Sequence, residues 1–330
     1  MLPARLLVVD DEPANLAVLR QILEPDYSLL FARNGLDAVE LAKRHHPSLI
    51  LLDIQMPGMD GYSACSALKA DPSTEAIPVI FVTTLSQLGD EERGFDVGCV
   101  DYLVKPVTAG IVRARVRAHL SLVQAKQLDR SYRDALAMLA KAGHYNDSDT
   151  GVHMWRMAAY ARRLAEAAGW LPERCELLEL AAPMHDTGKI GIPDALLRKP
   201  GKLDAEEWVI MRTHSQIGHE ILSASEAPIF QLAAEIAHCH HEHWDGGGYP
   251  RGLAGEDIPE SARIVAIADV FDALTMKRPY KEAWPIERTL ETMQTASGQQ
   301  FEPRLIERFM AIMPQILEIK ASWDERDPSA

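Results

Sequence analysis

The sequence is poor in cysteine and has no long hydrophobic run. Its four cysteines are scattered, without a CxxC pair or the spacing of a disulfide framework. We therefore expect the cysteines to be small buried side chains of a protein in a reducing compartment. No stretch approaches the roughly 18 apolar residues that a membrane span needs, and the opening MLPARLLVVDDEP contains too short an apolar run for a signal peptide. These absences predict a cytoplasmic protein that does not act in a membrane.

The sequence also lacks an excess of positive charge. Residues 1–125 carry 11 basic and 16 acidic side chains, a net charge of −5, and the remainder carries 23 and 32, a net charge of −9. Proteins that bind nucleic acid need a basic face, so neither half is expected to bind it, and a transcription factor is a poor interpretation. The length of 330 residues predicts two domains, at about 100–200 residues each.

Short apolar runs alternate with helical patterns in the first third of the chain. The runs are RLLVVD, YSLLFA, SLILLD, IPVIFV and CVDYLV. Apolar runs of this length, bounded by acids, are typical of buried strands, and their alternation with helices predicts an α/β doubly wound fold with five parallel strands. Functional groups in such sheets gather at the carboxyl ends of the strands. The residues expected there are Asp10, Asp11, Asp53, Thr83 and Lys105.

This set of side chains suits a site that accepts a phosphoryl group. Asp53 would be the nucleophile, and Asp10 and Asp11 would bind the Mg²⁺ that neutralises the phosphoryl oxygens. Lys105 would add a fixed positive charge, and Thr83 a hydroxyl group. One acid at a strand end is more simply a solvated turn residue, but five suitable residues at five successive strand ends are not explained in that way.

The motifs DIQMPGMDG and DYLVKP give this region a resemblance to the receiver domains of response regulators. The resemblance covers about residues 3–122 and implies a receiver domain over residues 1–122. It further implies phosphorylation of Asp53 by a cognate sensor histidine kinase, and it places Tyr102 where that family keeps a switching aromatic residue.

A helical pattern without proline follows, from Thr108 to about Gly143, and we expect residues 123–143 to be a helical linker. Four apolar residues within it are spaced as in a short heptad seam: Leu128, Tyr132, Ala135 and Leu139. Two interpretations stay open. The helix pairs two subunits into a homodimer that transmits a signal, or it is a connector that packs on its own domains.

The second half, residues 144–330, has no clear strand pattern and is expected to be all α. It contains two notable motifs, HDTGK and HHEHWDGGGYP. Glycine and proline in the latter oppose a helix, so this run should form a loop whose backbone can approach a ligand. Together the motifs resemble those of the HD-GYP cyclic di-GMP phosphodiesterases, a branch of the HD metallohydrolases. The resemblance implies an HD-type metallohydrolase domain.

The same resemblance implies a metal site. The residues that correspond to the family's metal ligands are His153, His185, Asp186, His214, His240, His241 and Asp269. A single histidine would more simply be a core residue, and we leave His219, His238 and His243 as bystanders or as residues that support the ligands. Ligands of nitrogen and oxygen type suit Fe, Mn, Ni or Zn. Seven ligands exceed the needs of one ion, so two divalent transition-metal ions are expected, bridged by Asp186.

The resemblance also implies the reaction, which is hydrolysis of cyclic di-GMP to pGpG and onward to GMP. A hydroxide shared by the metals would attack phosphorus in line, and Lys189 would orient a phosphate oxygen or the nucleophile. Tyr249, Arg278 and Lys281 would contact the phosphate and nucleotide. For the last two residues, a solvated helix end stays open as an alternative.

Two other functions stay open at this point. The enzyme could prefer linear pGpG. Alternatively, the second half could be a phosphorylation-controlled interaction module that binds partners such as cyclase-domain proteins and keeps only a vestigial metal site. The complete set of ligands argues against the module, which would not need it.

The sequence departs from the family pattern in two places. The segment SGQQFEP has Gln300 and Glu302 where relatives usually have histidine and aspartate, and glutamate is the poorer N-cap. Asp149 replaces a glutamate that helps some members to bind a third ion. Because its side chain is one methylene shorter, we expect Asp149 to lie outside the metal's coordination shell, with two ions bound.

Overall fold

The computed structural model describes residues 3–84, 93–143, 151–276 and 283–325. The chain divides into two compact units, Met1–Arg130 and Ser131–Ala330, and each is described by itself. The domain boundaries expected from the sequence, at residues 122 and 143, stay predictions.

The first unit contains the five-stranded parallel sheet that the sequence predicts. Its strands are β1 (Arg5–Val9), β2 (Ser28–Ala32), β3 (Leu49–Asp53), β4 (Val79–Thr83) and β5 (Asp101–Val104). Their order in the sheet is β2-β1-β3-β4-β5, and every neighbouring pair is parallel. The order reverses between β1 and β3, so the crevice for chemistry lies at the carboxyl ends of these two strands.

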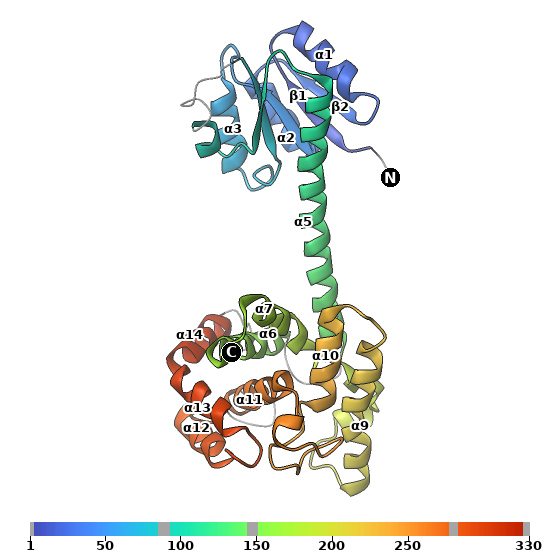
Figure 1. Ribbon diagram of the computed structural model, residues 1–330, viewed down its shortest axis with the longest axis vertical. Coiled ribbons are helices and arrows are strands. Elements are labelled where there is room, and N and C mark those ends of the chain that lie inside the picture. Colours follow the sequence, from blue (N-terminus) through green and yellow to red (C-terminus); the bar gives the residue numbers. More distant parts are fainter. Residues whose placement is uncertain (1–2, 85–92, 144–150, 277–282, 326–330) are drawn as a thin grey trace. The chain divides into compact units, whose positions relative to one another are not determined.

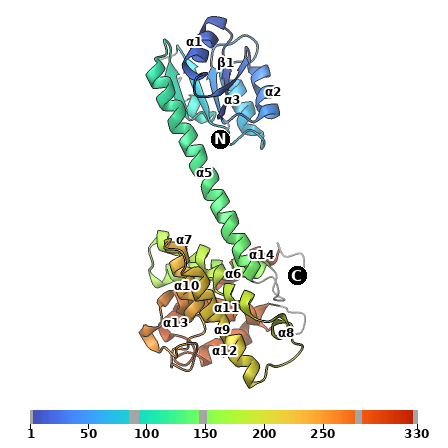
Figure 2. The ribbon, with the colours of Figure 1, turned by 90° about the vertical axis from the view of Figure 1, so that its right-hand side faces the viewer.

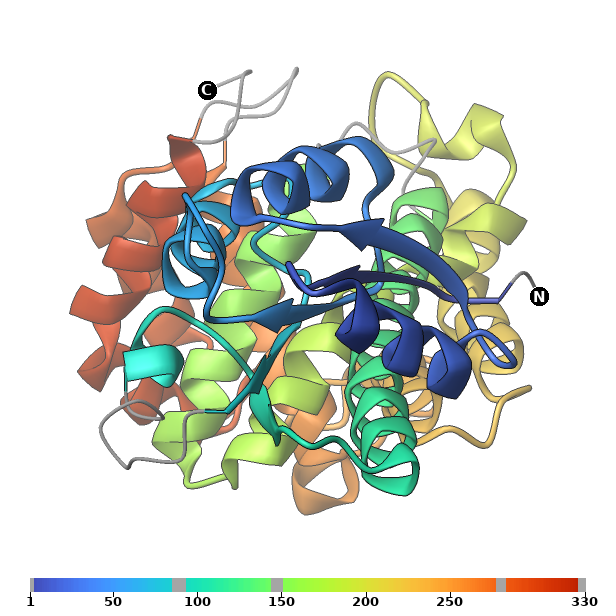
Figure 3. The same cartoon turned by 90° about the horizontal axis from the view of Figure 1, so that it is seen from above.

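Helices cover both faces of the sheet (Figure 3), and alternate strand residues belong to two separate cores. Leu6 and Val8 share a core with α1 (Pro13–Leu23) and the first turns of α5 (Ala109–Gly143). Leu7 and Val9 share another core with α2 (Gly35–His45) and α3 (Gly61–Ala70). Because both faces are covered, the strands read as continuous apolar runs rather than as alternating ones.

The helix predicted between residues 108 and 143 is observed as the single helix α5. Three of its four seam residues are exposed: Leu128 by 72%, Tyr132 by 40%, and Ala135. Leu139, by contrast, packs against the core of the second unit. Pairing of two subunits along this helix therefore stays a prediction for its exposed part.

The second unit is all α, as predicted (Figures 1 and 2). Its helices are α6 (Gly151–Ala168), α7 (Pro172–Ala181), α8 (Asp194–Leu197), α9 (Ala205–Leu222), α10 (Pro228–Cys239), α11 (Glu260–Thr275), α12 (Ile286–Thr295), α13 (Pro303–Ala311) and α14 (Met313–Asp324). Short 3-10 helices lie between them at η1 (Ala182–Met184), η2 (Thr187–Gly191) and η3 (Gly255–Asp257).

An aromatic contact fixes the central helices of this unit. The ring of Phe271 on α11 meets Tyr160 on α6 edge-on, with centroids 5.5 Å apart, and meets Phe309 on α13 at 5.2 Å. All three rings are fully buried. Edge-to-face pairs at this separation add to the stabilisation from burial. The packing gives a rigid base for α6 and α11, the helices that carry His153 and Asp269.

The four cysteines are free and buried, as their scatter predicts. Among the described residues, no helix combines the length and apolar character that a bilayer span requires.

Candidate metal centre and phosphoacceptor site

The HD motif lies where a helix is broken by proline. Pro183 follows the end of α7, and the chain continues in the tighter 3-10 geometry of η1 and η2. Asp186 lies between these two turns with φ −102° and ψ 11°, the bridge region in which many active-site residues are found. The break turns both His185 and Asp186 into the interior of the unit, where they are buried.

Gly188 lets the turn η2 approach α9 closely. A Cβ atom at this position would lie 1.9 Å from the carbonyl oxygen of His214 and 2.4 Å from the backbone nitrogen of Gly218, so another residue would push the two elements apart. This close approach brings Asp186 next to His214. The glycine of the HDTGK motif is therefore required by packing.

Adjacent histidines follow the end of α10 at Cys239, and the loop after them folds back on a buried acid. The carboxylate of Glu242 accepts hydrogen bonds from the backbone N–H groups of Arg251 (2.8 Å) and Leu253 (3.0 Å). Gly248 passes so close to this turn that a Cβ would lie 2.5 Å from the Cα of Glu242. Sequence reasoning gave no function to Glu242, although an acid inside a glycine-rich loop is a usable signal for a residue that organises the loop.

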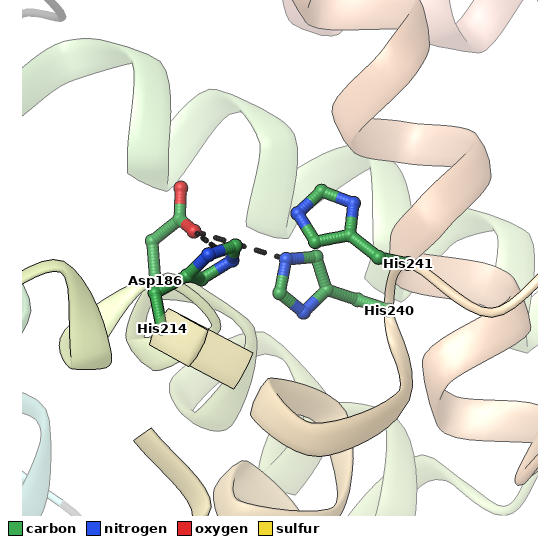
Figure 4. A group of neighbouring side chains, drawn as sticks. All are labelled: Asp186, His214, His240 and His241. Atoms are coloured by element: carbon green, nitrogen blue, oxygen red, sulfur yellow. Dashed lines mark ion pairs between the residues drawn. The ribbon is translucent and has the colours of Figure 1, made fainter. Parts of the chain in front are cut away.

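Four of the seven predicted ligands form one cluster. One side-chain ligand atom from each of Asp186, His214, His240 and His241 lies within 4.8 Å of the others. Oδ1 of Asp186 faces Nε2 of His214 at 3.4 Å and Nε2 of His240 at 3.8 Å (Figure 4). The other carboxylate oxygen, Oδ2, lies 3.2 Å from Nε2 of His185. Asp186 is therefore the residue around which the imidazoles converge.

The orientation of three histidines is fixed by the backbone. Nδ1 of His185 lies 2.9 Å from the carbonyl oxygen of Ala182, and Nδ1 of His214 lies 2.7 Å from that of Met211. Nδ1 of His240 contacts the carbonyls of residues 236 and 237 at 3.1 and 3.2 Å. A carbonyl only accepts, so each Nδ1 carries a proton and each Nε2 is directed toward Asp186, as in metal-binding histidines.

The remaining predicted ligands lie at the edge of the cluster. Oδ1 of Asp269 is 3.9 Å from Nε2 of His153 and 4.0 Å from Nε2 of His185. His185 thus faces both aspartates. The structure brings the seven residues together around two carboxylates, and their assignment as ligands stays a prediction.

The electrostatics of the cluster favour a bound cation. Burial lowers the pKa of His241 to about 3, with further lowering by His214, and it lowers the pKa values of His214 and His240 as well. Burial also disfavours the charged form of His185, but Asp186 outweighs it and raises that pKa to about 9. His214, His240 and His241 are therefore favoured in the neutral form, which is the form that binds metal, whereas His185 holds a proton between itself and Asp186 that a bound metal would replace.

One buried acceptor supports the same conclusion. Nε2 of His240 is enclosed and has no hydrogen-bond partner among the residues that the structure describes. Such a group is destabilising unless an ion or water satisfies it. The donor set, nitrogen and oxygen without sulfur, fits a divalent transition metal.

Two cationic side chains and a tyrosine border the cluster. Nζ of Lys189 lies 2.7 Å from Oδ2 of Asp186. The ring of Tyr249 stacks on His241, with centroids 4.7 Å apart and planes at 27°. The guanidinium of the exposed Arg212 lies 5.1 Å from the Tyr249 centroid. Burial raises the pKa of Tyr249, so it is a neutral phenol. Sequence reasoning missed Arg212, which lies outside both motifs.

Three sequence predictions cannot be placed in this way. Asp149, Arg278 and Lys281 lie outside the described residues. His219 and His238, left as bystanders, stack on one another with ring centroids 4.4 Å apart and are not part of the metal cluster.

Glu302 does not cap α13, which agrees with its poor N-cap propensity. It is instead buried and forms ion pairs with Arg263 and with Nε of Arg304, the latter at 2.6 Å. The preceding residues support the glycine-rich loop, since the backbone N–H of Asp245 donates to the carbonyl of Gln299 at 2.8 Å. The longer side chain of glutamate therefore serves an ion pair rather than a cap.

In the first unit, Lys105 joins two acids at the carboxyl ends of the strands. Its Nζ lies 2.6 Å from Oδ2 of Asp53 and 2.7 Å from Oδ2 of Asp10. Carboxylate oxygens of Asp10, Asp11 and Asp53 lie within 4.8 Å of one another. The amide of Asn15, which sequence reasoning missed, donates to Oδ1 of Asp10 at 2.9 Å. The arrangement holds three carboxylates where one cation can contact them all.

Asp53 and its neighbours have the burial expected of a switchable site. Burial raises the pKa of Asp53, against the opposing effect of Lys105. Thr83 is buried at the end of β4. The ring of Tyr102 lies between Phe81 and Phe95, with centroid distances of 5.6 and 5.4 Å. Both predicted switch residues are therefore inside the unit.

Comparison with known proteins assigns the two units separately. Residues 6–117 match the response regulator receiver domain, and residues 122–305 match the HD domain. The chain is 37% identical to a protein of Vibrio cholerae serotype O1 named "Probable cyclic di-GMP phosphodiesterase", over 98% of this chain and 80% of that one. It is also 37% identical to the cyclic di-GMP phosphodiesterase response regulator RpfG of Xanthomonas campestris pv. campestris, over 95% and 89% of the two chains.

A third relative has a higher identity over a shorter stretch of the chain. It is 3'3'-cGAMP-specific phosphodiesterase 2 of Vibrio cholerae serotype O1, which is 47% identical over 56% of this chain and 35% of its own length.

Proposed function

Because this chain belongs to the response regulators that join a receiver domain to an HD-type phosphodiesterase domain, we propose that it hydrolyses cyclic di-GMP to pGpG and onward to GMP. The observation that carries the proposal is the convergence of Asp186 with His214, His240 and His241, in which ligand atoms lie within 4.8 Å of one another. A protein that only bound partners would have no use for such a buried set of donors.

The chain offers a full set of ligands for two divalent transition-metal ions, of Fe, Mn, Ni or Zn. Asp186 would bridge them, and the other ligands would be His153, His185, His214, His240, His241 and Asp269. When bound, the ions would neutralise charge on the phosphate oxygens and make water more acidic.

The residues around the cluster would bind and orient the substrate. Lys189 is held by Asp186 and carries a positive charge that can contact a phosphate oxygen. Tyr249 stacks on His241, and the guanidinium of Arg212 lies over the ring of Tyr249. Planar groups stacked in this way suit a ligand that carries both bases and phosphates. Arg278 and Lys281 would add contacts to the second phosphate of the dinucleotide.

The receiver unit would regulate this activity. We propose that a sensor histidine kinase phosphorylates Asp53, with Mg²⁺ bound by Asp10, Asp11 and Asp53, and that Lys105 then pairs with the phosphoryl group. A phosphoryl group adds about −1.5 to −2 charges at pH 7. Thr83 and Tyr102 would respond to it. Pairing of subunits along α5 and contact with cyclase-domain proteins are further parts of the proposal.

A second substrate is favoured by a specific observation. The identity of 47% to a 3'3'-cGAMP-specific phosphodiesterase, over 56% of this chain, exceeds the identity of 37% to each of the two relatives that match nearly the whole chain. Hydrolysis of 3'3'-cGAMP is therefore a candidate beside cyclic di-GMP, as is a preference for linear pGpG.

Turnover of three purified dinucleotides tests the proposal. Full-length protein is incubated with cyclic di-GMP, 3'3'-cGAMP or pGpG, and products are separated by chromatography. Asp186→Ala is the control, since it removes the central carboxylate. We expect cyclic di-GMP to be cleaved and the control to be inactive. Faster cleavage of another dinucleotide would make that dinucleotide the substrate. If none of the three dinucleotides is cleaved, the proposal is contradicted and the phosphorylation-controlled interaction module is the better interpretation.

A further inference from the structure

A buried chain of charged groups joins His153 to the C-terminal helix α14. Arg156 donates from Nε to Oδ1 of Asp272 at 2.5 Å and from Nη2 to Oδ2 at 2.9 Å. Its Nη1 reaches Oδ1 of Asp324, the last residue of α14, at 2.8 Å. Nδ1 of His153 forms a hydrogen bond with Oδ2 of Asp272. Helix α6, which carries His153 and Arg156, packs against both α11 and α14.

The centre of this chain is shielded from water. Asp272 is fully buried, and His153 and Arg156 are exposed by only 2% and 3%. The guanidinium of Arg156 donates to both oxygens of Asp272, so Asp272 is a carboxylate that accepts hydrogen bonds. A buried ion pair commonly contributes no more stability than well-packed apolar residues would. Stability is therefore a weak explanation for the buried pair of Arg156 and Asp272.

The contact made by His153 differs from those of the other histidines around the cluster. His185, His214 and His240 each direct Nδ1 at a backbone carbonyl of the preceding turn, whereas His153 directs Nδ1 at a carboxylate. An ionised carboxylate only accepts, so Nδ1 carries the proton and Nε2 is left facing Oδ1 of Asp269 at 3.9 Å. A carboxylate partner also makes the imidazole more basic and hence a stronger ligand.

We infer that Asp272 and Arg156 are positioning residues for His153 as a metal ligand, and that Asp324 ties this function to helix α14. Arg156 holds both oxygens of Asp272 in its planar fork, which fixes the carboxylate that orients His153. Asp324 occupies another donor of Arg156 and so fixes the arginine itself. The inference rests on the proposed function, because it requires His153 to bind metal.

Titration of the metal-free, full-length protein with Co²⁺ tests this inference without reference to activity. Cobalt absorption reports both affinity and ligand geometry. We expect Asp272→Asn and Arg156→Gln to weaken Co²⁺ binding by about 10–100-fold, the usual effect of losing a partner of a metal-bound histidine. Arg162→Gln is the matched control, since Arg162 lies on the same helix but pairs with Glu166 and Glu179. It should bind Co²⁺ like the unaltered protein.

A double substitution separates positioning from a general structural effect. In a His153→Ala background, Asp272→Asn should weaken Co²⁺ binding no further, because its effect passes through His153. Additive losses would show that Asp272 acts only through the fold and would overturn the inference. If His153→Ala weakens Co²⁺ binding but Asp272→Asn does not, the inference about positioning is wrong, while the ligand set of the proposed function stands. If His153→Ala changes nothing, the ligand set of the proposed function fails too.

Asp324→Asn provides a second test in case Asp272→Asn does not fold. The Asp324 side chain is 36% exposed, so its replacement should disturb folding less than replacement of the buried Asp272. We expect a smaller loss of Co²⁺ affinity than for Asp272→Asn, and expect it to vanish in the His153→Ala background. If Asp324→Asn binds Co²⁺ as tightly as the unaltered protein, α14 does not help to position His153.

Discussion

The ammonium group of Lys189 lies 2.7 Å from Oδ2 of Asp186, while Oδ1 of the same carboxylate faces the histidines of α9 and α10. The two oxygens therefore have different surroundings, one paired with a cation and the other directed at imidazole nitrogens. Asp186 would hold a bound metal, and Lys189 lies beside it with a positive charge that can contact a phosphate oxygen.

Replacement of Asp186 by alanine should abolish catalysis while the unit stays folded. The core of the unit is formed by apolar faces of α6, α11 and α13, which Asp186 does not hold together. We expect turnover to fall by a factor of at least about 10³, as is typical when metal catalysis is lost, with unchanged circular dichroism. Phosphodiesterase activity within tenfold of the unaltered protein would contradict the two-metal account.

Replacement of Lys189 by methionine should lower kcat and leave metal content unchanged. Removing one charged group that stabilises a transition state commonly lowers kcat by about 10²–10³. Lys199→Met is a matched control, because Lys199 pairs with Glu207 on α9, away from Asp186. Kinetics and elemental analysis of both variants check the prediction. Loss of metal in Lys189→Met would instead show that the lysine supports the ligands.

Replacement of Tyr249 should affect substrate binding through its ring and not through its hydroxyl. The ring stacks on His241 and is in contact with the guanidinium of Arg212, so Tyr249→Ala removes a stacking surface whose loss is worth roughly 1–3 kcal/mol. We expect KM to rise about tenfold or more. Tyr249→Phe keeps the ring and should show a KM near that of the unaltered protein. Equal losses in both variants would point to the hydroxyl.

Phosphorylation of Asp53 should raise the rate of the HD domain. A new anion beside Lys105 and Thr83 changes the balance of charge in a buried site that now pairs Lys105 with Asp10 and Asp53. Coupling between two sites in one protein is commonly about fivefold or more, and we expect activation of that size. The measurement is turnover with and without beryllofluoride, with Asp53→Asn as control. The same rate in all samples would show that the receiver does not control catalysis.

The fold and the motif residues could be predicted because their signals are local. Each strand of the sheet is an apolar run, and Asp53 and Lys105 follow such runs directly in the sequence. Their meeting at one edge then follows from the geometry of a parallel sheet. In the second unit, the resemblance of HDTGK and HHEHWDGGGYP pointed to residues that the structure brings together around Asp186 and Asp269.

The supporting residues could not be predicted because their partners are distant in the sequence. Asp272 is 119 residues from His153 and 116 from Arg156, and nothing near Asp272 in the chain indicates these contacts. Arg212 reaches Tyr249 only because α9 and the glycine-rich loop are neighbours in space. Glu302 looked like a weak N-cap, yet its function depends on Arg263, 39 residues away. Contacts between long side chains that are distant in the sequence produce no periodic sequence pattern from which they could be predicted.

Metal content measured together with turnover tests the central claim most directly. Full-length protein is analysed for metals, stripped with a chelator, and assayed with cyclic di-GMP before and after addition of Mn²⁺, Fe²⁺, Ni²⁺ or Zn²⁺. The account predicts about two ions per chain, no hydrolysis by the stripped protein, and recovery when one of these ions is restored. Hydrolysis that continues unchanged in the stripped protein would contradict it.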